Sequence, residues 1–184
     1  MLLSAVSALV VAQSSSEIPE GLMNNTVHKG RKTFYAASVY MDYNETIENN
    51  FQTLENVLEF TEGAKLIITM DSNARSTTWH EVITNNRGKM MEKFVASYQL
   101  HIINEDSPRK TFQSSRGSSN INLTIVNKQM LPEIKNCEIL EEESASDHNI
   151  LKFSINFEND KTNKSNTIGL RCIIKEQQHK EFYK

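Results

Sequence analysis

The sequence predicts an α+β fold, in which β-strands and amphipathic helices alternate along a chain long enough to bury a hydrophobic core. Its 184 residues suit one domain of this kind. Runs of β-branched and aromatic residues give way twice to stretches whose apolar residues are spaced three and four apart. Residues 121–126 then alternate apolar and polar side chains, as a strand with two different faces does. These two patterns together indicate strands joined by helices.

The expected strands are runs of apolar, β-branched and aromatic residues bounded by turn residues. They cover residues 2–11, 33–40, 65–70, 100–103, 121–126 and 150–157, with short ones at 111–112 and near Ile139. Two polar stretches are expected to be loops, residues 14–30 and the glycine- and serine-rich "SSRGSSN" at 114–120.

Two segments have the period of an amphipathic helix. The first begins near Asn44 and ends at Gly63, and its apolar face consists of Ile47, Phe51, Leu54 and Leu58. The second has Asn85 or Asn86 as its N-cap, and its apolar face consists of Met90, Met91, Phe94, Val95 and Tyr98.

Composition and charge bound the function only loosely. The formal net charge is −3 and the pI is about 6.0, so no overall basic bias indicates nucleic acid, although a local patch can still attract phosphates. No apolar run reaches the roughly 18 residues that span a membrane. The N-terminal "MLLSAVSALVVAQSSS" could pass for a signal peptide, but it lacks a basic n-region, so a core strand is preferred and secretion is not expected.

Asp71 and Asn73 follow the expected strand 65–70 at a spacing of two. In an extended chain such residues point the same way, so both can reach one point beyond the strand end. A carboxylate can orient a water or hold Mg²⁺, and an amide can donate to a phosphoryl oxygen, which suits phosphodiester hydrolysis. Taken alone, the pair favours an Asx-turn without chemistry.

Asp147 and His148 precede the last expected strand. Histidine suits proton transfer near neutral pH, and a surface or capping histidine is the alternative. Both side chains can reach one site only if they lie in a turn, because neighbours diverge in a strand.

Asn122 and Tyr40 are two further polar positions on expected strands. Asn122 lies on the polar face of strand 121–126 with Thr124, a pattern that by itself indicates a half-exposed edge strand. Tyr40 ends its strand as Asp71 does, where packing is the common role and phosphate contact the alternative.

The order of these features resembles the endonuclease/exonuclease/phosphatase superfamily. The matching blocks are "SVY", "MDSNARSTTW", "NNRGKMMEKF", "TF", "RGSSNINLT" and "SASDHNIL". More narrowly, they resemble the endonuclease domain of arthropod non-LTR retrotransposons, which is similar to apurinic/apyrimidinic endonucleases. The resemblance covers residues 1–157, and the polar residues 158–184 are expected to be a linker or the start of a missing downstream region.

The resemblance implies two β-sheets packed face to face with helices outside, a four-layer, deoxyribonuclease-like sandwich. It implies phosphodiester cleavage of DNA with Mg²⁺ or Mn²⁺, the step by which such elements nick a target to prime reverse transcription. The implied site residues are Asp71 to orient water, Asn73 to bind phosphate, Tyr40 within the site, Asp147 near the metal, and His148 on the scissile phosphate. Arg75, Arg116 and Ser119 are expected to face DNA, although either arginine alone is also typical of solvated surface charge.

The chain departs from the family pattern in two ways. Where the family has an aspartate that hydrogen-bonds the site histidine, this chain has Asn122, which cannot stabilise an imidazolium by charge. In a Ser-His-Asp triad, the corresponding change of Asp to Asn lowers the catalytic rate by about 10⁴-fold, which gives the scale of such an effect in another reaction. The family's first strands, with an Asn and the Glu that is its main metal ligand, precede anything that matches Met1, and neither Glu17 nor Glu20 is a credible substitute. A weak or inactive nuclease is therefore expected.

Three other interpretations stay open. The chain can be an active nuclease whose start lies upstream of Met1. It can also be a non-catalytic module that binds nucleic acid or protein in the groove that is catalytic in the family. A phosphatase of the same superfamily is less favoured, because "NARSTTW" and "RGSSNI" resemble the nucleases. The family implies DNA as the partner, no membrane, no small-molecule cofactor, and a nuclear or cytoplasmic location.

Overall fold

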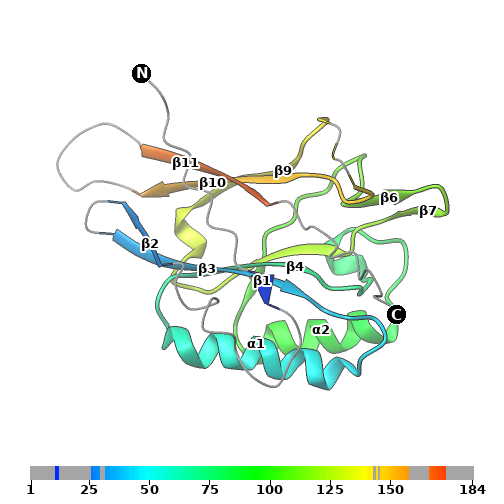
Figure 1. Ribbon diagram of the computed structural model, residues 1–184, viewed down its shortest axis with the longest axis horizontal. Coiled ribbons are helices and arrows are strands. Elements are labelled where there is room, and N and C mark those ends of the chain that lie inside the picture. The colour runs from blue at the N-terminus through cyan, green and yellow to red at the C-terminus, as the bar shows by residue number, and fades with distance from the viewer. Residues whose placement is uncertain are drawn as a thin grey trace, which may run out of the picture.

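The computed structural model describes residues 11–12, 26–29, 32–142, 144, 146–157 and 166–172. Two α-helices lie on one face of a six-stranded sheet, and a three-stranded sheet lies on the other face (Figure 1). The helices are α1 (Ile47–Thr61) and α2 (Asn86–Ser97), and short 3-10 turns occur at Thr77–Trp79 and Leu131–Glu133.

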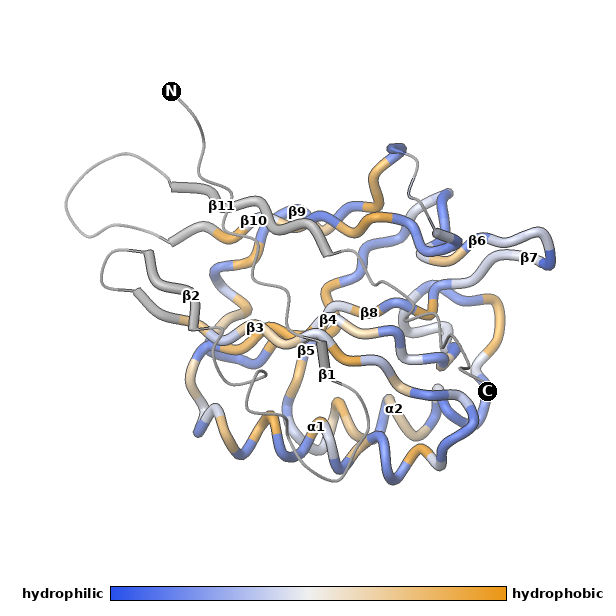
Figure 2. Tube along the Cα trace, in the orientation of Figure 1, coloured by the Kyte–Doolittle hydropathy of each residue, from blue (hydrophilic) through white to orange (hydrophobic). Residues whose placement is uncertain are grey.

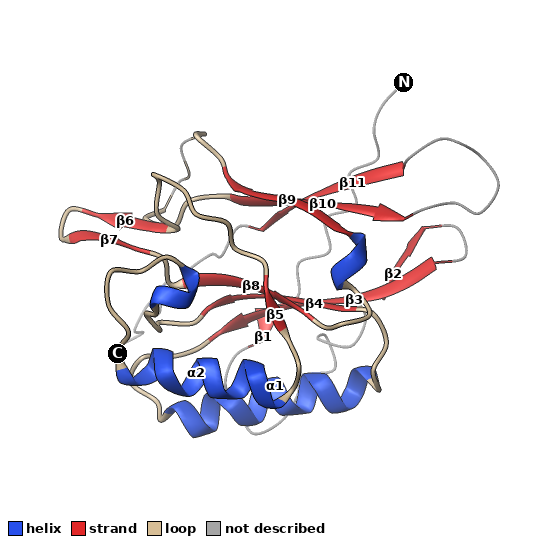
Figure 3. Cartoon of the chain, turned by 180° about the vertical axis from the view of Figure 1, so that it is seen from behind, coloured by secondary structure: helices blue, strands red, loops and turns tan. Residues whose placement is uncertain are grey.

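The large sheet has the strand order β1-β3-β4-β8-β5, and β2 also pairs with β3. Its strands are β1 (Val11–Ala12), β2 (Thr26–Lys29), β3 (Lys32–Tyr40), β4 (Leu66–Asp71), β5 (His101–Ile102) and β8 (Asn122–Val126). The small sheet consists of β9 (Ile134–Ile139), β10 (Leu151–Phe157) and β11 (Asn166–Cys172). β6 (Phe112–Ser114) and β7 (Gly117–Ser119) form a separate hairpin that projects from one end of the molecule (Figure 3).

Both helices begin with an N-cap side chain that the sequence supplies. Thr46 caps α1 by accepting a hydrogen bond from the Asn49 N–H, and the helix ends at Glu62, which has a left-handed φ of 47°. Asn85 caps α2 through its Oδ1, which accepts from the Gly88 N–H at 2.7 Å. The predicted helices and the N-cap position of the second are thus confirmed.

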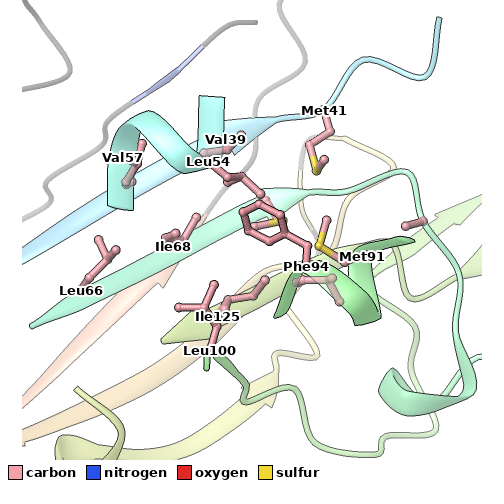
Figure 4. Close-up of a cluster of buried hydrophobic side chains, with 14 of the residues drawn as sticks. Val39, Met41, Leu54, Val57, Leu66, Ile68, Met91, Phe94, Leu100 and Ile125 are labelled. Atoms are coloured by element: carbon pink, nitrogen blue, oxygen red, sulfur yellow. The ribbon is translucent and has the colours of Figure 1, made fainter. Parts of the chain in front are cut away.

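Alternate residues of the central strands pack into two separate hydrophobic cores, one on each face of the large sheet. Leu66, Ile68 and Met70 of β4 face the helices, while Ile67 faces the small sheet. Figure 4 shows the first core, in which α1 and α2 side chains close over β3, β4 and β8. The second core joins the two sheets and contains Phe34, Ile67, Val126, Met130, Cys137, Phe153 and Ile155. Figure 2 shows the matching hydropathy: apolar residues follow the inner strands, and the tip of the β6–β7 hairpin is hydrophilic.

Four expectations about individual segments are wrong. Residues 26–29, expected within a loop, form β2 against β3, and the expected loop 114–120 largely forms the β6–β7 hairpin. Residues 122–126 form a central strand between β4 and β5, with every side chain buried, and so they are not a half-exposed edge. Residues 166–172, expected to belong to a linker or to the start of a downstream region, pair along their whole length with β10. The expected strand at residues 2–10 lies outside the described residues.

The predicted class, an α+β fold with packed sheets flanked by helices, is confirmed. The described residues form three of the four layers that the family resemblance implies, because both α-helices cover the same sheet (Figures 1 and 3). In the described part of the chain, neither helix has the length and hydrophobicity to cross a membrane.

Candidate functional site

Three strand ends bring the candidate residues together. β3 and β4 are parallel and pair Tyr40 with Asp71, while β8 is antiparallel to β4 and pairs Asp71 with Asn122. The carboxyl ends of β3 and β4 therefore meet the start of β8 at one edge of the large sheet. A cleft of about 540 Å³ opens at this edge. Its lining includes six of the predicted residues: Tyr40, Asp71, Asn73, Arg75, Ser119 and His148.

Asp71 and Asn73 form a turn and line the cleft at the same time. The Asp71 Oδ1 accepts from the Asn73 N–H at 3.2 Å, an Asx-turn in which Asn73 has a left-handed φ of 48°. The Asn73 Nδ2 donates to the Met41 carbonyl at 3.0 Å and so ties the end of β4 to the end of β3. Because an amide carries two N–H donors, one remains for a ligand in the cleft. The Asx-turn and the catalytic role, which the sequence left as alternatives for Asp71 and Asn73, are therefore compatible.

His148 is held by the start of the β6–β7 hairpin. The segment 147–149 lies antiparallel to 111–113: the Gln113 N–H donates to the Asp147 carbonyl, and the Asn149 N–H donates to the Thr111 carbonyl, each at 2.8 Å. The imidazole is 3 % exposed and meets the Phe112 ring edge to face, with centroids 5.0 Å apart. This pairing makes the segment extended, so neighbouring side chains point to opposite sides.

Asn122 determines which nitrogen of His148 carries the proton. The Asn122 Nδ2 donates to the Thr111 carbonyl at 3.2 Å, so its Oδ1 is the atom that faces the imidazole Nδ1, at 3.0 Å. An amide oxygen is only an acceptor, and therefore Nδ1 must be the protonated nitrogen. The other nitrogen, Nε2, lies 3.9 Å from the Asp71 Oδ2. A neutral His148 thus presents an acceptor toward Asp71, and it becomes a donor at Nε2 only when it is protonated.

The sequence did not single out a role for Tyr43, which lines the cleft, or for Arg87, which packs against it. Tyr43 follows the end of β3, lines the cleft and is 67 % exposed. The guanidinium of Arg87, from the first turn of α2, lies 5.8 Å from its ring centroid and donates to the carbonyls of Glu45 and Asp42. Burial lowers the pKa of Arg87, while the nearby Tyr43 and Asp42 oppose this shift. An aromatic residue in the polar run "DYNET" was the only signal in the sequence.

Two predicted residues lie elsewhere. Asp147 is exposed and points away from His148, and Arg116 is exposed at the turn of the β6–β7 hairpin; neither lines the cleft. Trp79, the tryptophan of the "MDSNARSTTW" block, is fully buried and packs in the hydrophobic core.

The described residues do not by themselves form a divalent-metal site. Mg²⁺ in proteins uses one or two carboxylates together with waters and phosphates. Asp71 is the one carboxylate among the described residues that line the cleft, and no group of three metal-ligating side chains occurs in the described part of the chain. Asp71 can contribute to a metal site but does not complete one.

The two-sheet fold and the order of its strand-end residues are those of an endonuclease-like domain of the endonuclease/exonuclease/phosphatase class. Residues 34–152 match the endonuclease-reverse transcriptase family, and the chain belongs to this family.

Two relatives agree with this assignment. The chain is similar to the retrovirus-related Pol polyprotein from the type-1 retrotransposable element R1 of Bradysia coprophila, with 26% identity over 134 residues. The match covers 68% of this chain but only 13% of that polyprotein. It also resembles the solved endonuclease domain of TRAS1, a telomere-specific non-LTR retrotransposon, with a TM-score of 0.67 and 26% identity. That likeness covers 73% of this chain and 63% of the TRAS1 chain.

Proposed function

We propose that this chain is a DNA endonuclease domain that hydrolyses a phosphodiester bond in its strand-end cleft, at a low intrinsic rate. The observation that carries the proposal is the convergence of Asp71, Asn73 and His148 on one cleft in a chain of a nuclease family. Asp71 orients the attacking water, Asn73 donates to a phosphoryl oxygen, and protonated His148 donates through Nε2 to the scissile phosphate.

Two features of the described residues support a low rate. Asn122 holds His148 through a neutral amide and therefore adds no charge that would favour the imidazolium. The cleft also offers one described carboxylate toward a metal ion, although the family is metal-dependent. A non-catalytic module that binds DNA in the same cleft is the second candidate, and these same two features favour it.

The test is nicking of supercoiled plasmid in the presence of Mg²⁺ or Mn²⁺. Asp71→Asn and His148→Ala are each expected to lower the nicking rate by about 10²-fold, because each removes a group that acts on the reacting atoms. Asp71→Asn keeps an oxygen for the Asx-turn, so it removes charge with little change of backbone. Lys128→Ala, which removes an exposed cation just after the end of β8 and so at the sheet edge opposite the cleft, is the matched control and should nick at the parent rate. Equal background nicking in all variants would leave the binding module as the function.

DNA binding is expected to depend on salt through the cleft arginine. Arg75 is exposed and lines the cleft, so Arg75→Ala should reduce the slope of log Kd against log salt by about one. Fluorescence anisotropy with a labelled DNA duplex between about 50 and 200 mM salt measures this slope. An unchanged slope for Arg75→Ala would place the phosphate contacts outside the cleft.

A further inference from the structure

The cleft has an apolar rim beside its polar floor. Asp71, Asn73, Ser119 and His148 supply the polar floor. Tyr43 and Ile83 line the same cleft and are 67 % and 57 % exposed, which is unusual for large apolar side chains in the described part of the chain. Exposed apolar groups that gather at one rim of a polar cleft mark a binding surface.

The loop that carries Tyr43 is fixed before any ligand arrives. The Asp42 Oδ1 accepts from the Asn44 N–H at 2.8 Å, and the Asp42 carbonyl accepts from both Asn50 Nδ2 and Arg87. Arg87 also lies over the Tyr43 ring. A ring that packs against a guanidinium and lines a cleft loses little entropy when it binds a second flat group.

We propose that Tyr43 is a base-stacking residue, which binds an unstacked nucleobase next to the phosphate held over Asn73 and His148. The inference rests on the proposed DNA-binding function of the same cleft. A nucleotide joins a charged phosphate to a flat apolar base, and the cleft joins polar donors to an exposed aromatic ring in the same way. Ile83 borders the base from the loop before α2, as apolar wedge residues do beside opened base steps.

The test measures how Tyr43→Ala changes two quantities, the affinity for DNA and the dependence of that affinity on salt concentration. Tyr43→Ala is expected to weaken binding of a short fluorescein-labelled oligonucleotide by about tenfold at every salt concentration, with no change of the log–log slope. Stacking neutralises no phosphate and releases no counterion, so this signature is the opposite of that expected for Arg75→Ala. Tyr43→Trp should restore the affinity, because a larger ring stacks at least as well.

The matched control is Tyr98→Ala. Tyr98 is also an exposed tyrosine, 42 % exposed at the end of α2, but it does not line the cleft, and its hydroxyl donates to Glu55. This variant should bind as the parent does. Tyr43→Ala with parental affinity for both single-stranded and duplex DNA overturns the stacking role while the proposed function stands. A loss of affinity with an altered slope overturns it too, because Tyr43 would then act on phosphate contacts. A parent chain that binds no DNA removes the proposed function together with this inference.

Discussion

Asn122→Asp is expected to lower the free energy of unfolding by about 3 kcal/mol at about pH 8, although it restores the carboxylate that the family resemblance implies. Asn122 is 1 % exposed, and its Nδ2 donates to the Thr111 carbonyl at 3.2 Å. A carboxylate would replace that donor with an oxygen facing another oxygen. The Thr111 carbonyl also accepts from the Asn149 N–H, so it cannot easily turn away.

Urea unfolding measures this effect, and Asn120→Asp is the comparison variant. Asn120 is also buried and its Nδ2 donates to a carbonyl, that of His80, but its Oδ1 accepts from the Thr111 N–H rather than from an imidazole. Asn120→Asp should lose stability by a similar amount, because it too replaces an N–H donor that faces a carbonyl oxygen. An Asn122→Asp variant as stable as the parent at about pH 8 would show that the Thr111 carbonyl does not constrain this position.

Gly88→Ala is expected to destabilise the protein by about 3 kcal/mol, against the usual preference for alanine in helices. Gly88 lies in the first turn of α2, where a Cβ would lie 1.9 Å from the Arg75 carbonyl oxygen and 2.8 Å from its carbon. These are backbone atoms, so no side-chain rotation relieves the clash.

The backbone at Arg75 has little freedom to move. Its N–H donates to the Asn85 Oδ1, and its carbonyl accepts from the Asn85 N–H at 3.0 Å. The flanking Ala74 and Ser76 are fully buried. We therefore expect the variant to separate α2 from the loop that carries Arg75, which also lines the cleft.

Chemical denaturation of Gly88→Ala beside Lys89→Ala tests this prediction. Lys89 is the next residue of α2 and is exposed, so its substitution should change stability by less than about 0.5 kcal/mol. If Gly88→Ala is at least as stable as the parent, the close approach of Arg75 to the helix is wrong. The Gly88→Ala variant should also bind DNA more weakly, because the displaced loop moves Arg75 away from its position in the cleft.

The helices, the inner strands and much of the cleft could be predicted because their signals are local. The spacing of Ile47, Leu54 and Leu58 predicts a helix whatever it packs against, and Asn85 is a good cap by its own chemistry. The strand ends at Tyr40 and Asp71 could be placed at one edge through the family resemblance. Asp147 could not be placed, because the pairing of 147–149 with 111–113 decides that it points away from His148.

The sequence by itself determined the order of elements, the family and the residue types at the strand ends. Only the tertiary structure decided that the polar face of Asn122 and Thr124 is buried between sheets, and that Thr111 orients the Asn122 amide. It likewise decided that Arg87 supports Tyr43. The reason is physical: hydrophobic period and capping depend on neighbours along the chain, whereas burial of a polar group and the direction of its hydrogen bonds depend on segments that meet only after folding.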